Sequence, residues 1–268
     1  ILKANPQDVG ALRYRATSYA RLGKAQLAIA DLEKTIAIED VDSWTFSTYG
    51  HMLESLGKYE DAILAYRKAI ELGGVAFENY NDLNSALIHV GRFEEGLLWS
   101  ERAIAKLPGN ASLHVTKAHM LYALDKIQTA WREIELASSM GDFSVYMYDV
   151  RARILKKKGE LTAAIACLKA GVAVHPSDAF LHCQLSDLYL ESGKVQNAKS
   201  ECELAVRLDP AIGYPQAREV FTAIDEKKAF EYAVRAVELN PLDGGELAAL
   251  GLLKQSKGDN AGAFRDFD

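Results

Sequence analysis

The chain has 268 residues, of which 49% are hydrophobic and 25% are charged. This composition supports a sizeable core and lacks the signature of a disordered protein. The formal net charge is -6 and the pI is about 5.6, which argues against a general nucleic-acid surface. Cys167, Cys183 and Cys202 form no CxxC pair and are too few for a disulfide framework or a zinc site. We expect a folded chain with no nucleic-acid partner, no cofactor and no metal.

Membrane and export signals are also missing from the sequence. No apolar run approaches the roughly 18 residues that a membrane span needs, and no signal peptide is recognisable at the start. The chain opens at ILKANP without an initiating Met, so the second observation carries little weight. We expect no membrane insertion and leave the compartment open, with a preference for the cytoplasm.

Residues of one type recur along the chain at intervals that are multiples of 34. The proline series is Pro6, Pro108, Pro176 and Pro210. A second series is Gly23, Gly57, Gly91, Asp125, Gly159 and Gly193, and a third is Ala28, Ala62, Gly96, Ala130, Ala164 and Ala198. Three series at one period indicate an array of structural repeats.

The residue pattern within each repeat predicts two amphipathic helices joined by a Gly-containing turn. We number the positions of a repeat from 1, which falls on Val9, Ser43, Phe77, Ala111, Val145 and Ala179. The first helix covers positions 1–14 and the second about positions 17–30. Positions 4, 8 and 11 hold a large, a small and a large residue, which form one helical stripe. Ala or Gly at position 20 makes the matching close contact on the second helix.

In chain order, the predicted units cover residues 9–42, 43–76, 77–110, 111–144, 145–178 and 179–212, then a shortened 213–243 and a partial 244–268. The interval from Pro210 to Pro241 is 31 residues. We expect the deletion at the start of AIGYPQAREVFTAI, with a first helix that begins at Pro215 and is one turn shorter. The last predicted helix stops at AFRDFD without a polar capping helix, and repeat arrays need solubilising caps. We therefore expect a single solenoid that is a segment of a longer chain.

The pattern resembles the tetratricopeptide repeat, whose signature is a large residue, Leu, a small residue, Tyr, Gly, Ala, an aromatic, Ala and Pro at these positions. The segments SWTFSTYGHMLESLGKYEDAILAYRKAIELG and AFLHCQLSDLYLESGKVQNAKSECELAVRLDP carry it well. The resemblance covers almost the whole chain. It implies an all-α fold, a right-handed superhelical solenoid of antiparallel helix pairs.

No motif for nucleotide binding, serine hydrolysis or HExxH metal binding is present. His114 and His182 fall at core position 4, where packed imidazoles are expected. His51 and Glu54 form an i, i+3 pair of possible ligands, but two ligands do not make a metal site. We expect no catalytic residue and no enzymatic activity in this segment.

Charged residues elsewhere have ordinary structural explanations. Position 7 carries Arg15, Lys117 and Arg151, whose stems we expect to cover a neighbouring helix while the charged heads reach the edge. Paired carboxylates such as Glu133 and Glu135 are expected at helix starts or on solvated outer faces.

The resemblance implies that the first helices line a concave groove and that positions 2, 5, 9, 12 and 13 meet a ligand. Helical geometry agrees, because positions 2, 5, 9 and 12 avoid the core stripe. The candidate binding residues at these positions are Trp44, His51, His119, Tyr122, Tyr146, Arg153, Lys156 and Phe180. We expect an aromatic and basic patch from Ser112 to Phe180 that binds an acidic-aromatic peptide. Padding between adjacent repeats is the alternative for the aromatics.

The basic run RARILKKKGELTAAI contributes Arg153 and Lys156 to this patch. The next repeat offers Asp187, Leu190 and Glu191 at positions 9, 12 and 13, so the run is too short for a nucleic-acid stripe.

We therefore predict a non-catalytic scaffold that binds a peptide or a protein surface in the groove. The alternative is a regulatory or substrate-recruiting array of an enzyme, such as a glycosyltransferase, whose catalytic domain lies outside this segment. A third possibility is a spacer that oligomerises through its shortened seventh unit, and the oligomeric state stays open.

Overall fold

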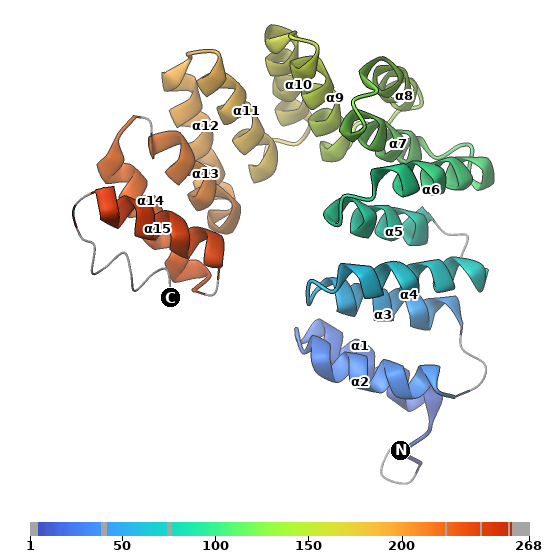
Figure 1. Ribbon diagram of the computed structural model, residues 1–268. Helices are drawn as coiled ribbons and strands as arrows, with labels where there is room; N and C mark the ends of the chain where they lie inside the picture. Colours follow the sequence, from blue (N-terminus) through green and yellow to red (C-terminus); the bar gives the residue numbers. More distant parts are fainter. Residues whose placement is uncertain are drawn as a thin grey trace. The chain divides into compact units, whose positions relative to one another are not determined.

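The computed structural model describes residues 5–38, 42–73, 77–222, 224–241, 243–256 and 258. All regular structure in these residues is α-helical (Figure 1). The helices are α1 (Val9–Arg21), α2 (Ala25–Ile36), α3 (Ser43–Glu54), α4 (Tyr59–Glu71), α5 (Phe77–His89), α6 (Phe93–Lys106), α7 (Ala111–Ala123), α8 (Ile127–Ser139), α9 (Val145–Lys157), α10 (Leu161–Val174), α11 (Ala179–Glu191), α12 (Val195–Leu208), α13 (Pro210–Thr222), α14 (Glu226–Leu239) and α15 (Gly244–Ser256). None of these helices has the length and apolarity to cross a bilayer.

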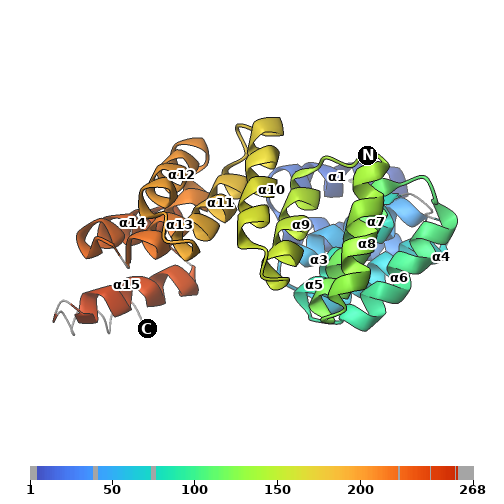
Figure 2. The same cartoon turned by 90° about the horizontal axis from the view of Figure 1, so that it is seen from above.

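The chain folds into two compact units, residues 1–142 and residues 143–268. Within each unit, consecutive helices pack against each other in chain order (Figures 1 and 2). The predicted all-α solenoid of antiparallel helix pairs is confirmed.

Local sequence explains where the helices begin and turn. Asp8, Asp42 and Asp178 cap α1, α3 and α11, because a carboxylate oxygen of each accepts a backbone N–H three residues on. At the turn after α3, Gly57 has a φ of 71°, a left-handed conformation that glycine adopts without steric cost. Asp125 occupies the same position with a φ of 58°. The glycine series at 34-residue spacing therefore marks the turn inside each helix pair.

Small residues at position 20 hold the two helices of a repeat together. Ala28, Ala62, Ala130, Ala164 and Ala198 all have no exposed surface. Larger side chains fill the space around them, as in the cluster of residues 53–87 that includes Tyr66, Leu83 and Leu87. The core is thus built from repeated contacts within each helix pair and between neighbours.

The shortened seventh repeat differs from the sequence-based expectation. The helix α13 begins at Pro210, keeps 13 residues and contains Pro215 in its interior. Asp209 alone separates it from α12, whereas residues 175–178 separate α10 from α11. The deletion therefore removed residues from the connection and left the helix at full length, so the predicted start at Pro215 is wrong.

Two features permit this tight connection. Pro210 occupies the first helical position, where its missing N–H costs nothing. The Asp209 carboxylate accepts the N–H of Ala211 at 2.9 Å, which caps the new helix. As a result α13 contacts both α11 and α12. The segment AFRDFD, on which the missing cap was predicted, lies outside the described residues.

Candidate protein-binding faces of the first helices

The predicted binding positions lie on the first helix of each repeat. In residues 1–142 these helices are α1, α3, α5 and α7, and in residues 143–268 they are α9, α11, α13 and α15. The side of these helices that carries the predicted binding positions is called the first-helix face of each unit below.

On the first-helix face of residues 1–142, Trp44 is 40% exposed. The guanidinium of Arg13, on the preceding first helix, lies 4.4 Å from the centre of its ring. Arg13 also forms an ion pair of 3.0 Å with Asp42. The cation–π contact holds the indole in place at the surface while part of its area remains open to solvent.

His51 connects two repeats on the same face. Its Nε2 lies 2.7 Å from Oδ2 of Asp82 on α5, and this hydrogen bond is the main cause of the raised pKa of His51. Glu54 has other partners, because its carboxylate accepts hydrogen bonds from Tyr66 and Ser85. The described residues contain no group of three or more His, Cys, Asp or Glu that could hold a metal ion.

The remaining predicted residues of this unit are less accessible. His119 and Tyr122 on α7 are half-buried. The hydroxyl of Ser112, where the predicted patch begins, donates to Asp142 at 2.7 Å. Trp44 is therefore better placed to meet a partner than either residue of α7.

On the first-helix face of residues 143–268, the predicted basic anchors have acidic partners within the unit. Nε of Arg153 donates to Asp149 at 2.9 Å, and Nζ of Lys156 lies 2.5 Å from Oε2 of Glu191 on α11. Burial raises the pKa of the Asp149 carboxyl, against the pull of Arg153. Less positive charge is available to an acidic peptide than the sequence pattern predicted.

The aromatic residues predicted for this unit are partly covered. Tyr146 and Phe180 are half-buried, and burial raises the pKa of the Tyr146 hydroxyl. Part of their surface therefore packs inside the unit, in line with the alternative that such aromatics pad adjacent repeats.

In three repeats, position 23, which lies in the second helix, carries an acidic residue that the sequence pattern did not single out. It pairs with position 4 or 7 of the first helix, in the pairs Arg15–Asp31 at 2.5 Å, His114–Glu133 at 2.7 Å, Lys117–Glu133 at 2.8 Å and His182–Glu201 at 2.6 Å. Glu133 is only 15% exposed, so the expectation of a solvated outer face is wrong for it. The heads of Arg15 and Lys117 pair with these carboxylates of the second helix, while the Arg15 side chain remains 40% exposed. The recurrence of an acidic residue at position 23 in three repeats is the sequence feature that could have predicted these ion pairs.

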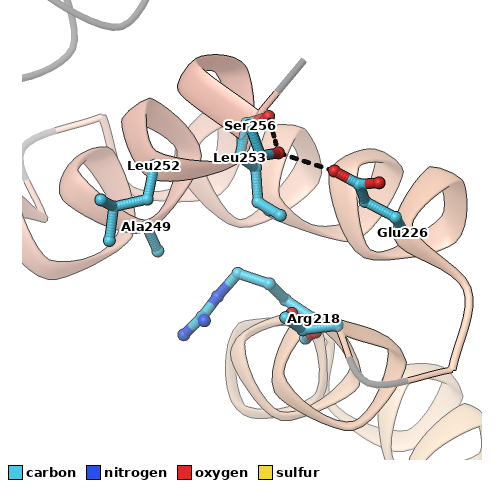
Figure 3. Close-up of a pocket in the computed structure, with 7 residues that line it drawn as sticks. Arg218, Glu226, Ala249, Leu252, Leu253 and Ser256 are labelled. Carbon is cyan, nitrogen blue, oxygen red and sulfur yellow. Dashed lines mark hydrogen bonds between the residues drawn. The ribbon is translucent and has the colours of Figure 1, made fainter. Parts of the chain in front are cut away.

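A cavity of about 380 Å³ lies on the first-helix face between α13 and α15 (Figure 3). Its lining residues are Arg218, Thr222, Glu226, Ala249, Leu252, Leu253 and Ser256. The sequence pattern did not single out this site, because the seventh repeat breaks the 34-residue register and its positions match only when they are counted back from Ala229.

Asp187 is a half-buried carboxyl on the first-helix face of residues 143–268. Burial, helped by the nearby Glu219 carboxylate, raises the pKa of Asp187 to about 6, although the amide of Gln216 donates to it. Because this pKa lies above that of the unfolded chain, Asp187 contributes stability at low pH that is lost as the pH rises through about 6.

We expect Asp187→Asn to raise the free energy of unfolding at pH 7 by about 1–2 kcal/mol and to leave it nearly unchanged at pH 4. Urea unfolding of both chains between pH 4 and 7 measures the difference. Glu219→Gln serves as the control and should reproduce only a small part of the effect. Equal pH slopes in the wild type and Asp187→Asn would contradict the assignment.

Comparison with known proteins supports the repeat pattern. Residues 46–72 and 181–212 match the family model described as tetratricopeptide repeat. Anaphase-promoting complex subunit 7 of Mus musculus is 23% identical over 163 residues, which cover 60% of this chain and 28% of that protein. The chain thus spans less than a third of this relative.

Two crystal structures share the fold. A tetratricopeptide repeat protein from Parabacteroides merdae superposes with a TM-score of 0.71 at 16% identity, over 92% of this chain and 99% of that one. Yeast Tom70 also gives a TM-score of 0.71, at 15% identity, over 91% of this chain and 54% of its own. With the 34-residue period, the helix pairs and the two matched segments in agreement, the chain contains tetratricopeptide repeats.

Proposed function

We propose that the chain is a non-catalytic scaffold for protein interaction, which binds a peptide segment or a protein surface on its first helices. The observation that carries this proposal is Trp44, which is 40% exposed and is held at the surface by Arg13. Tryptophan and arginine are enriched among the residues that dominate binding energy at protein interfaces. A tryptophan fixed in place also loses little conformational entropy on binding.

The comparisons support the same proposal. The mouse relative is named as a subunit of a complex, so its own role lies in an assembly of proteins. This chain spans only part of that relative and shares few identical residues with it. The comparison therefore supports a role in protein interaction but does not identify the partner.

The contacts of the basic residues modify the expected peptide chemistry. Arg13 has Asp42 as a partner, Arg153 has Asp149 and Lys156 has Glu191. An acidic peptide would have to compete with these carboxylates. We therefore assign most of the affinity to aromatic and aliphatic side chains of the partner, and a smaller, salt-dependent share to its carboxylates.

Affinity capture followed by a binding measurement tests the proposal. We expect Trp44→Ala to weaken the captured partner by about 2 kcal/mol, or roughly 30-fold in Kd, since buried tryptophan anchors have this effect. The double variant Arg153→Glu with Lys156→Glu should weaken it by about 1 kcal/mol or more. Titration calorimetry with the purified partner gives both values.

Leu64→Ala is the matched control, because Leu64 is exposed on the second helix α4 and away from the first-helix face. It should leave Kd unchanged. A partner that tolerates the Trp44 and Arg153/Lys156 variants but loses affinity with the Leu64 variant would place binding on the second helices and overturn the proposal.

A further inference from the structure

The cavity between α13 and α15 has an apolar middle. Ala249, Leu252 and Leu253 of α15 form one wall, and Leu252 is 60% exposed. Counting back from Ala229 at position 20, Arg218 falls at position 9 of its repeat, and Leu252 falls at position 9 of the next. An exposed leucine beside a cavity of about 380 Å³ presents apolar surface whose burial by a partner would be favourable.

The two ends of the cavity carry opposite hydrogen-bonding groups. Figure 3 shows the Arg218 guanidinium turned toward Ala249 and Leu252, with Glu226 at the other end beside Ser256. Nε and Nη2 of Arg218 donate to Glu246 at 3.1 and 3.2 Å. Among the described residues Nη1 has no acceptor, so its two N–H groups are available.

At the opposite end, Oε1 of Glu226 accepts the hydroxyl of Ser256 at 2.6 Å. The other oxygen of Glu226 has no hydrogen bond from the described residues. One end of the cavity can therefore donate a hydrogen bond and the other end can accept one, with an apolar wall between them.

This arrangement favours neither sign of ligand charge. A carboxylate in the cavity would meet Glu226 as well as Arg218, and an ammonium group would meet Arg218 as well as Glu226. A peptide unit instead carries one C=O acceptor and one N–H donor and no charge. The volume is at the lower end of the range of about 300–1,000 Å³ for ligand pockets, which suits one or two side chains.

We propose that this cavity binds a neutral aliphatic side chain of a partner peptide, of the leucine class. The backbone C=O of the inserted residue accepts from Arg218, its N–H donates to Glu226, and its side chain packs on Ala249 and Leu252. The assignment rests on the proposed scaffold function and names an anchor for it in residues 143–268. It also differs from the acidic peptide expected from the sequence.

N-acetyl-leucine N-methylamide is a suitable probe, because it presents one leucine side chain between two amides. Methyl resonances of Ala249, Leu252 and Leu253 should shift saturably when it is titrated into the full chain and observed by NMR. The N-acetyl N-methylamides of glutamate and lysine should cause shifts at least fivefold smaller at the same concentration. We expect Leu252→Glu to weaken the leucine probe at least tenfold.

Leu239→Glu is the matched control, because Leu239 is 53% exposed in the same unit and does not line the cavity; it should leave the titration unchanged. Absent shifts at the three cavity residues, or equal shifts with the glutamate probe, would overturn the assignment. So would concentration-dependent dimerisation in sedimentation that Leu252→Glu abolishes, since a second copy would then be the occupant. Because no partner is needed, failure here is separate from failure of the capture experiment with Trp44→Ala.

Discussion

Replacing Gly213 by alanine should lower the free energy of unfolding of residues 143–268 by about 3 kcal/mol, at the upper end of the usual cost of overpacking. A Cβ at this position would lie 2.4 Å from both Cα and N of Val206. These are backbone atoms of α12, so no side-chain rotation can relieve the contact. The single connecting residue Asp209 prevents the two helices from moving apart.

Urea unfolding of the full chain, followed by circular dichroism, measures this loss. Gly10→Ala is the control, since Gly10 lies exposed in α1 and a Cβ there would meet only Oδ1 of Asp8 at 3.4 Å. Because alanine is the better helix former, the control should be neutral or stabilising by about 0.5–1 kcal/mol. If Gly213→Ala unfolds like the wild type, the close approach of α12 and α13 is wrong.

Gly50→Ala should destabilise residues 1–142 by about 2 kcal/mol for a related reason. A Cβ at Gly50 would lie 2.5 Å from Cε1 of the Tyr66 ring. Tyr66 has no exposed surface, and its hydroxyl donates to Glu54 at 2.8 Å. Packing and the hydrogen bond together keep the ring from swinging away, so the added methyl group overpacks the helix pair.

The equivalent positions of the first repeat suggest a second substitution that should relieve this overpacking. Position 8 and position 24 hold Ala16 and Leu32 in the first repeat, and both belong to one buried cluster. Gly50→Ala should therefore cost much less when combined with Tyr66→Leu. We expect a coupling of about 1.5 kcal/mol or more in the double-mutant cycle, measured by urea unfolding. Simple additivity of the two single changes would show that the methyl–ring contact is not the cause.

The local parts of the structure could be predicted from the sequence. The spacing of Gly57 and its equivalents marks the turns, and the alanines at position 20 mark the close contacts inside each helix pair. His114 and His182 are buried as position 4 requires. These features depend on residues less than one repeat apart, so helical periodicity reports them directly.

The partners of charged residues could not be predicted in the same way. Glu133 was expected to be solvated, but it lies between His114 and Lys117. Lys156 is 48% exposed, and its ion pair with Glu191 of the next repeat was not predicted. Such pairs depend on the distance and rotation between helices, which a one-dimensional pattern does not contain.

The sequence by itself thus determined the class of fold, the helix pairs and the side of each first helix that is not core. Only the tertiary structure decided how closely α12 and α13 approach, and that α13 begins at Pro210. It also decided that a cavity opens between α13 and α15. The physical reason is that a periodic pattern records which face of a helix is buried. A three-residue deletion instead changes the distance between two helices, and that distance is set only when neighbouring side chains pack.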